Sequence, residues 1–509
     1  MLNTSAAFAP YADTRQCDIR VSFRLINKDA YSDATATATQ YNTDVSQLTQ
    51  THDLVEGMGA KYATLETHGW PLDGTCDIMP DSVSGIQTGF WSVPSGADGT
   101  FETDPTLTFA FTSDHSSVGF TVIFDDKANR FPKTMTVTAY DSSDAELDSD
   151  TVTVTSARQV VDLPVENYRK IVISFSEARE PYQRVRVSEV VFGIVQHFDN
   201  ENTSGATLLY SISPAAENLP SNELTLTFEN ADAKYNMVSP SSVFAYLQQG
   251  QSLDAEIGIG LEYVNMGKFY FAKAQAQDGS LTARITAYDR LYQLDKSICG
   301  IGTTGTWTVA DAVAAVIADS GLSITTDIPT ATGALTINKC IPADTTHREA
   351  LRLIAQAAMC TCYFDRDDVL IFAEVAAGTA VDTLDADNMH DYPQIEITDR
   401  INTVELTVRD EYAETENIYT AADVEPGETA QVWSVDNPLV YDGNTVAAWL
   451  LDMAQMRTKY KITERGNPAR EIMDTATIYD AYGGHADAVI IKQDYVFDGG
   501  LTCNTEAVG

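Results

Sequence analysis

The segment GKFYFAKAQAQDGSLTARITAYDRLYQLDK, residues 267–296, contains the pattern that decides the fold. Two runs of strand-forming residues, KFYFAKAQAQ and SLTARITAY, lie on either side of Asp278-Gly279. An Asp-Gly pair between two such runs is typical of a hairpin turn, so the segment predicts two antiparallel strands. Two more strand patterns, TLLYSIS and ELTLTFEN, precede it within residues 205–229. Together these segments indicate one β unit.

A single strand is predicted near the start of the chain. Residues 17–26 read CDIRVSFRLI, in which apolar side chains from Ile19 to Leu25 alternate with polar ones, as in a half-buried strand. The next residues, 27–51, are rich in Asp, Thr, Ser and Ala and predict an arm or linker. If the first strand pairs with the later β unit, the segment between them is an insertion. The sequence alone leaves this pairing open.

Residues of about 61–194 predict a β-sandwich or jelly roll. Short strand patterns such as GFTVIF, MTVTAY and KIVISF follow one another with turn residues between them, and helical periodicity is nearly absent. Aromatic residues of this region could stack on sugars at the rim of a sandwich, or they could pack in its core. These aromatic residues are Trp70, Phe90, Trp91 and Tyr182. Of these, Trp70, Trp91 and Tyr182 are the candidate carbohydrate-binding residues.

The hydrophobic period becomes helical after residue 305. TVADAVAAVIADS, residues 308–320, repeats apolar residues with helical spacing and is followed by Gly321 as a cap. A second helix is predicted to begin at Thr346, whose hydroxyl and the Glu349 carboxylate are spaced to satisfy each other's backbone amides. CYFDRDDVLIFAEV then adds two strands, which predicts a small α/β unit. A last β unit closes the chain, with the strand patterns NTVELTVRDEY and DAVIIKQDYVF.

The composition predicts a folded, acidic chain of several domains. Its 509 residues exceed what one hydrophobic core usually covers. The formal net charge of −41 opposes contact with phosphate backbones, so we expect no sequence-specific nucleic-acid binding. The seven cysteines form no C-x-x-C pair, which fits a reducing compartment. The sequence has neither a signal-peptide pattern nor a run of about eighteen apolar residues, so no transmembrane segment is expected.

One motif favours an enzyme. Residues 300–305 spell G-x-G-x-x-G before a helix, and Asp327 follows about twenty residues later, as in a dinucleotide site. However, residues 288–297 are charged and irregular where such a site needs a continuously apolar strand. We therefore expect no cofactor.

Two further groups of residues suggest metal or nucleophile chemistry. His347 is followed by Cys360 and Cys362, but C-x-C alone is a weak metal signal and a histidine in a first helical turn is commonly capping or solvated. The acidic runs 141–150 and 385–391 lack the glycine and glutamate of an EF-hand. We expect neither a metal site nor catalytic residues.

Several stretches, in a fixed order, resemble the baseplate hub and tail-tip proteins of phages and phage-derived injection particles. They are LPSNELTLTFENADAKYN at 219–236, the segment 267–296, ADAVAAVIADSGL at 310–322, THREALRLIAQAAMCTCYFDRDDVLIF at 346–372 and IIKQDYVFDGGLTCNTEAVG at 490–509. The resemblance covers about residues 200–509 and the first strand. Residues of about 52–198 instead resemble a galactose-binding, discoidin-like jelly roll through YATLETHGWPLDG, TGFWS and PYQRVRVSEVVFGI.

The resemblance implies a mainly β fold with α+β parts: two tube-like β-barrel domains, a small α/β domain between them and an inserted β-sandwich (jelly roll). The implied domains are the N-terminal strand and arm of the first hub barrel (1–51), the inserted galactose-binding-like β-sandwich (52–198), the remainder of the first barrel (199–295), the small α/β domain (296–392) and the second hub barrel (393–509).

The function implied by the resemblance is that of a structural virion protein and not an enzyme. A baseplate hub is typically a homotrimer, made in the host cytoplasm and assembled into the distal tail of a phage or bacteriocin. Its expected partners are the tail tube or distal tail protein, the tape measure protein and a spike or fibre protein, and DNA passes along its acidic lumen during ejection. The alternative is a host-attachment protein that binds a cell-wall glycan through the jelly roll. A cell-wall hydrolase or dinucleotide-dependent enzyme is the third hypothesis, against which the missing motifs argue.

Overall fold

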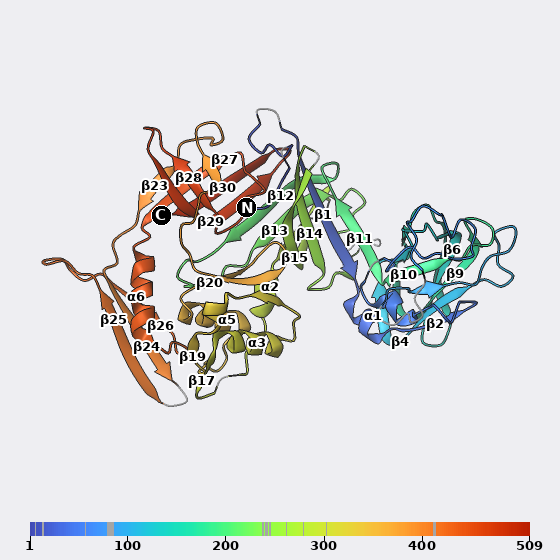
Figure 1. Ribbon diagram of the computed structural model, residues 1–509, viewed down its shortest axis with the longest axis horizontal. Coiled ribbons are helices and arrows are strands. Elements are labelled where there is room, and N and C mark those ends of the chain that lie inside the picture. Colours follow the sequence, from blue (N-terminus) through green and yellow to red (C-terminus); the bar gives the residue numbers. More distant parts are fainter. Residues whose placement is uncertain are drawn as a thin grey trace. The chain divides into compact units, whose positions relative to one another are not determined.

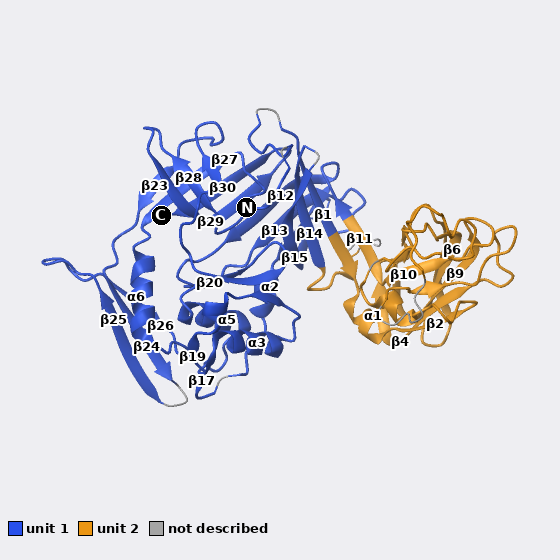
Figure 2. Cartoon of the chain, in the orientation of Figure 1, with its two compact units in different colours: residues 1–22, 197–241, 252–509 blue, residues 23–196, 242–251 orange. Residues whose placement is uncertain are grey.

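The computed structural model describes residues 1–509 except 6, 13–14, 56, 79–85, 237–238, 240–242, 244–245, 261, 278, 302 and 411–413. Two compact units make up the chain (Figure 2). Unit 1 comprises residues 1–22, 197–241 and 252–509, and unit 2 comprises residues 23–196 and 242–251. The five domains expected from the sequence have other boundaries, and that division stays a prediction.

Most strands of one 13-stranded sheet lie in unit 1, and its residues 23–26 and 193–196 belong to unit 2 (Figure 1). Its main path runs β11-β1-β14-β15-β16-β13-β12-β29-β30-β27-β23. Off this path, β28 pairs with β29 and β22 pairs with β28. The strands are β1 (Cys17–Ile26), β11 (Gly193–Phe198), β12 (Thr203–Ser211), β13 (Glu223–Glu229), β14 (Ser252–Ile259), β15 (Glu262–Ala276), β16 (Thr282–Tyr288), β22 (Asp382–Leu384), β23 (Gln394–Ile397), β27 (Thr458–Glu464), β28 (Thr475–Tyr479), β29 (His485–Phe497) and β30 (Leu501–Val508).

The structure decides the pairing of the first strand, which the sequence left open. β1 lies next to β14, so strands from opposite sides of the inserted segment share one sheet. β15 and β16 pair antiparallel with Ala276 opposite Ala283. Asp278 of the predicted hairpin turn lies outside the described residues.

The mainly β fold is confirmed, but the two tube-like barrels need correction. β12 and β29 pair antiparallel with Leu208 opposite Tyr495, so strands assigned to different barrels form one ladder. Within the described ranges no sheet closes on itself. The period-two pattern places side chains on a face, but it does not say which strand edges meet.

The middle of unit 1 is an α/β region with a shared core. Val313 of α3, Ile354 of α5, Leu406 of β24 and Leu450 of α6 are buried in one hydrophobic cluster. The elements are α2 (Arg290–Leu294), β17 (Thr306–Thr308), α3 (Val309–Ser320), β18 (Thr325–Asp327), α4 (Thr330–Gly333), β19 (Thr336–Asn338), α5 (His347–Ala357), β20 (Thr361–Phe364), β21 (Val369–Ala373), β24 (Thr403–Asp410), β25 (Thr415–Ala422), β26 (Val432–Asp436) and α6 (Gly443–Ala454).

Both predicted helix boundaries are confirmed. The Thr346 hydroxyl accepts a 3.1 Å hydrogen bond from the backbone amide of Glu349 at the start of α5. Gly321 ends α3 in the left-handed conformation, with φ of 68°, which glycine adopts without a steric penalty.

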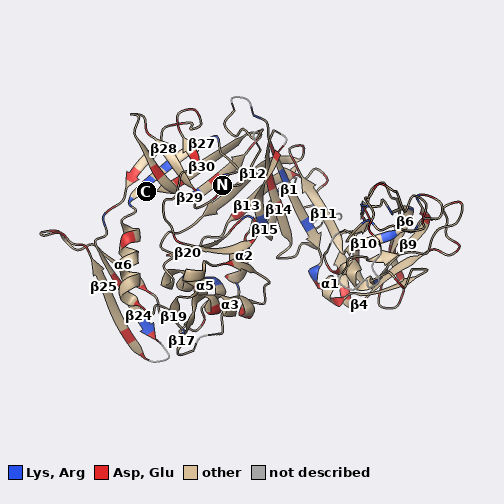
Figure 3. Cartoon of the chain, viewed as in Figure 1, with Lys and Arg blue, Asp and Glu red and all other residues tan. Residues whose placement is uncertain are grey.

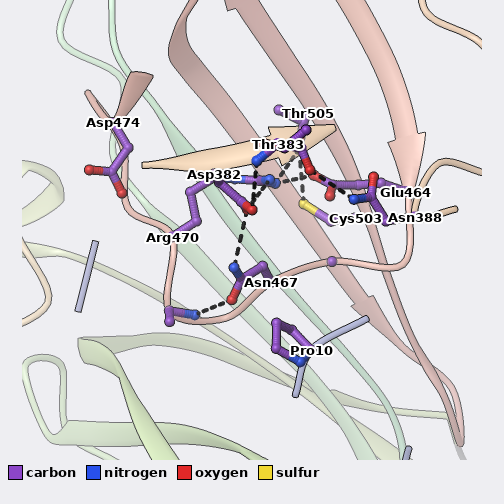
Figure 4. Close-up of polar contacts among 12 residues, drawn as sticks. Pro10, Asp382, Thr383, Asn388, Glu464, Asn467, Arg470, Asp474, Cys503 and Thr505 are labelled. Carbon is purple, nitrogen blue, oxygen red and sulfur yellow. Dashed lines mark hydrogen bonds and ion pairs between the residues drawn. The ribbon is translucent and has the colours of Figure 1, made fainter. Parts of the chain in front are cut away.

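A buried ionic network holds the loop between β27 and β28 (Figure 4). Arg470 pairs with Glu464 and, at 3.1 Å, with Asp382. Burial disfavours the charge of Arg470, but the Glu464 carboxylate keeps its pKa well above the usual value. Asn467 also donates a 3.1 Å hydrogen bond to Asp382, so hydrogen bonds as well as charge hold these residues together.

The N-terminal arm is tied to the same region of unit 1. Tyr11 donates a 2.8 Å hydrogen bond to Asp382. Arg15 donates to the carbonyl oxygens of Gly466 and Leu501, both at 2.8 Å. The arm therefore packs on the closing strands of the chain.

Unit 2 is a two-sheet sandwich. A five-stranded sheet, β2-β4-β9-β6-β7, and a four-stranded sheet, β3-β10-β5-β8, contribute side chains to one core, as expected for a jelly roll. The elements are α1 (Lys28–Asp33), β2 (Thr35–Thr39), the 3-10 helix η1 (Leu48–His52), β3 (Phe90–Trp91), β4 (Thr106–Ser117), β5 (Phe120–Phe124), β6 (Pro132–Tyr140), β7 (Glu146–Thr153), β8 (Arg158–Val161), β9 (Val165–Ala178) and β10 (Arg186–Val191).

Candidate ligand-binding site of unit 2

Three loops of unit 2 line a cavity of about 280 Å³. The segment between η1 and β3 contributes Lys61 and His68, the β5–β6 loop contributes residues 127–130, and the β9–β10 loop contributes Arg179, Glu180 and Gln183. Loops carried on a rigid sandwich are where such folds usually place binding residues.

Thr67 fastens the three loops to one another. Its hydroxyl donates a 2.7 Å hydrogen bond to the carbonyl oxygen of Pro181. Its own carbonyl oxygen accepts from Arg130 at 3.0 Å and from Gln183 at 3.3 Å. The cavity walls are thus connected by hydrogen bonds before any ligand is present.

Half of the polar side chains that line the cavity are cationic. Lys127 donates to the carbonyl oxygens of Met58 and Gly59, at 2.5 and 3.1 Å. The guanidinium of Arg179 lies 4.3 Å from the centroid of the Phe131 ring. Arg130 is only 5% exposed, and burial lowers its pKa below the usual value.

One acidic side chain shares the cavity. Glu180 accepts a 3.0 Å hydrogen bond from Gln183 and lies 2.8 Å from Nδ1 of His68. This pair joins the first loop to the third, and both side chains are largely exposed.

Trp91 does not lie at the rim, so this part of the expected site is wrong. The residue is 2% exposed, and its indole Nε1 donates a 2.7 Å hydrogen bond to the carbonyl oxygen of Thr88. Arg186 covers the ring at 3.7 Å and pairs with Asp125 at 2.9 Å. Trp91 is buried because β3 pairs with β10, which places Trp91 opposite Arg186 inside unit 2.

The other two candidate residues are at the surface. Trp70 is 59% exposed and follows His68 by two positions, and Tyr182 is 55% exposed and adjoins Gln183. Tyr182 has φ of 58°, a left-handed conformation that is uncommon for a bulky residue. Their contact with a sugar stays a proposal.

The sequence reasoning missed the basic residues of the cavity. Lys61, Lys127, Arg130 and Arg179 are far apart in the chain and belong to no motif. The one available signal was their rarity, because the chain has 32 basic and 73 acidic residues. Acidic residues are spread over both units (Figure 3).

The alternative metal or nucleophile site does not form from the residues first considered. Cys360 and Cys362 are buried, and burial raises the pKa of the Cys360 thiol to about 12, which keeps it protonated. His347 instead lies 2.8 Å from Asp319. Together with Cys299, these two residues offer ligand atoms within 4.8 Å of one another.

The dinucleotide motif has a different setting from that of a nucleotide-binding fold. Residues 290–294 ahead of it form helix α2, and its Gly302 lies outside the described residues.

None of the helices in the described part of the chain has the length and apolar character that a membrane span requires.

The structure is similar to those of phage tail proteins. One is the prophage MuSo2 43 kDa tail protein from Shewanella oneidensis, at 15% identity and a TM-score of 0.44, covering 62% of this chain and 94% of that one. Another is the tail protein from Neisseria meningitidis MC58, at 12% identity and a TM-score of 0.45, covering 62% and 94%. No family model and no curated protein matches the sequence.

A third similarity concerns about one third of the chain. Chitosan-binding module 1 from a Paenibacillus sp. IK-5 chitosanase/glucanase matches at 11% identity and a TM-score of 0.21, covering 34% of this chain and 98% of that one. The resemblances to tail proteins and to a carbohydrate-binding jelly roll, expected from the sequence, agree with these findings. At these identities the likeness concerns the fold.

Proposed function

We propose that this chain is a structural, non-catalytic subunit of a phage or phage-like tail. It acts as a baseplate hub in the distal tail, where a homotrimeric ring joins the tail tube to a spike or fibre. The order of the hub-like sequence segments within residues 200–509 supports this role. The net charge of −41 supports a lumen along which DNA slides without sticking.

The free edge of the large sheet carries the proposal. β23 ends the strand path, and it pairs only with β27 among the described residues. Ile395 and Ile397 on this strand are 48% and 68% exposed. An open edge with exposed apolar side chains is a template for pairing with another chain, and a closed ring of copies covers such an edge.

The mass of the full chain in solution tests this role. Native mass spectrometry or light scattering across concentration is expected to show a trimer. A chain that stays monomeric at every concentration, and in the presence of a tail-tube protein, would contradict the ring.

A second function is favoured by the loops of unit 2. We propose that the exposed rings of Trp70 and Tyr182, beside a polar cavity, bind a host cell-wall glycan, because exposed aromatic faces stack on sugar rings. Binding of the full chain to a glycan array is expected to fall in Trp70→Ala and Tyr182→Ala. Tyr482→Ala, which removes an exposed ring of unit 1, is the matched control. Equal binding by all three variants would argue against this site.

A further inference from the structure

We infer that the cavity of unit 2 binds an anionic group, a phosphate or carboxylate, carried by a cell-surface saccharide. This inference rests on the proposed glycan-binding function and names its ligand class. Four cationic side chains line the cavity: Lys61, Lys127, Arg130 and Arg179. Glu180 is the one carboxylate among the described lining residues. In a chain with more than twice as many acidic as basic residues, such a grouping is contrary to the composition.

These cations lack carboxylate partners within the described residues. Lys127 and Arg130 donate to backbone carbonyl oxygens, and Arg179 lies over the Phe131 ring. Lys61 lies 3.5 Å from the hydroxyl of Thr75. Their direct partners are therefore dipoles and a ring. Carboxylates such as Asp73 near Lys61 and Glu180 near Arg130 act on them electrostatically but form no ion pair with them among the described residues.

Elsewhere in unit 2, cations do meet acids. Lys133 pairs with Glu177 and Lys170 with Asp144, each at 2.5 Å. Arg186, which is buried near the same loops, pairs with both Glu66 and Asp125. The contrast identifies the cavity as a place where cations of unit 2 have no direct carboxylate partner among the described residues.

Burial makes that charge selective for an anion. Arg130 is 5% exposed, and its Nε has no hydrogen-bond partner in the described structure. Glu66, Asp125 and Glu180 all act on its charge, but Glu66 and Asp125 are bonded to Arg186, and Glu180 is bonded to Gln183 and His68. A buried cation without a carboxylate is unfavourable, and an entering anion relieves that cost through charge-assisted hydrogen bonds.

The size of the cavity suits one charged group and not a long polymer. Its volume of about 280 Å³ is near the lower limit of ligand pockets, which are about 300–1,000 Å³. The anion occupies the cavity, and the sugar ring that carries it lies toward Trp70 and Tyr182, both exposed on the same loops.

Calorimetry with the full chain tests the inference. The probes are a glycerol-phosphate oligomer, an oligogalacturonate, a neutral galactose oligosaccharide and inorganic phosphate. We expect one of the charged oligomers to bind at least about tenfold more tightly than the neutral one, because hydrogen bonds to charged groups are the stronger class. Which of the two binds identifies phosphate or carboxylate as the natural group. Added salt is expected to weaken this binding.

Matched variants locate the binding. Lys61→Gln and Arg179→Gln, both on loops, are each expected to reduce affinity for the charged oligomer about tenfold, whereas Lys133→Gln leaves it unchanged. Arg130→Gln is less informative because Arg130 also holds Thr67.

The outcomes separate this inference from the glycan function. Suppose that the neutral oligosaccharide binds as tightly as the charged ones, and that its binding is lost in Trp70→Ala but not in Arg179→Gln. This result would overturn the anionic ligand and leave the glycan-binding function standing. Inorganic phosphate that binds as tightly as the charged oligomers would also overturn it, because the saccharide would then contribute nothing to binding. No binding to any saccharide or host wall would overturn both proposals.

Discussion

Arg470 and Glu464 form an ion pair in which neither side chain is exposed to solvent. Removal of one partner leaves the other charge buried and unpaired, which is strongly destabilising. We expect Arg470→Ala to lower the unfolding free energy of unit 1 by about 3–5 kcal/mol, measured by urea denaturation. Arg409→Ala, which breaks the half-exposed pair with Glu416, is the control and is expected to cost less than about 1 kcal/mol. Similar losses of unfolding free energy in the two variants would mean that burial does not make the Arg470–Glu464 pair more important for stability than an exposed pair.

Trp91→Ala is expected to destabilise unit 2. The substitution empties a buried site and exposes the face on which Arg186 lies, at a cost of about 3–5 kcal/mol. Thermal unfolding followed by near-UV circular dichroism measures the loss. Trp70→Ala removes a ring of the same type from the surface and should leave the melting temperature almost unchanged, since surface substitutions cost roughly 0.5 kcal/mol or less. A large shift for Trp70→Ala would place that ring in the packing of unit 2.

Asp289 predicts a pH dependence of stability. Burial raises its pKa from 3.8 to about 7, although the amides of Asn222 and Leu291 donate to it. Above pH 4 the unfolded state loses this proton while the folded state keeps it up to about pH 7. The unfolding free energy should therefore fall as pH rises from about 4 to about 7, by up to about 4 kcal/mol from this residue.

The variant Asp289→Asn isolates that contribution. Asparagine keeps an oxygen that caps α2 but does not titrate. The stability of the variant relative to the original chain should therefore rise between pH 4 and 7 and stay level above it. A difference that does not change with pH would show that Asp289 is ionised throughout in the folded chain.

The free edge of β23 predicts an assembly defect. Ile395→Lys and Ile397→Lys place charges where a second copy is proposed to pair, so the trimer should dissociate at concentrations at which the original chain stays assembled. Leu281→Lys is the control, because Leu281 is exposed in unit 1 away from this strand. Native mass spectrometry measures the change. Intact trimers in both isoleucine variants would mean that another surface joins the copies.

The hydrogen bonds of Arg15 are expected to protect the N-terminal arm from proteolysis. Arg15→Ala removes the hydrogen bonds to the carbonyl oxygens of Gly466 and Leu501, so the arm should open more often and be cleaved several-fold faster in limited proteolysis. Lys234→Ala, at an exposed ion pair of unit 1, is the control. Unchanged cleavage would show that Tyr11 and the rest of the arm suffice.

Local patterns made the secondary structure predictable. The strand patterns and the start of α5 are determined by residues a few positions apart in the chain. The structure has these strands and this helix start. Even there, one half of the expected capping box differs, because the Glu349 carboxylate pairs with Arg352 at 2.7 Å. The sequence does not show which of several nearby partners a side chain will bind.

Contacts between distant segments were not predictable. Nothing in the pattern of β12 shows that β29 lies beside it, and nothing beside Trp91 shows that Arg186 covers its ring. The basic cavity is a similar case, since its cations come from three loops and their lack of acidic partners is a property of the folded chain. Trp70 and Tyr182 could be proposed in advance from residue type alone, but the same reasoning also chose Trp91, which is buried.

The hydrogen bond between Thr67 and Pro181 has an evolutionary consequence. It fixes two loops through one hydroxyl and one backbone carbonyl oxygen, and neither atom belongs to the side chains proposed to contact a ligand. Substitutions at Trp70, Arg179 or Tyr182 therefore leave the fastening of the loops in place. If these side chains bind a ligand as proposed, single substitutions at them can change which ligand is bound without removing this hydrogen bond.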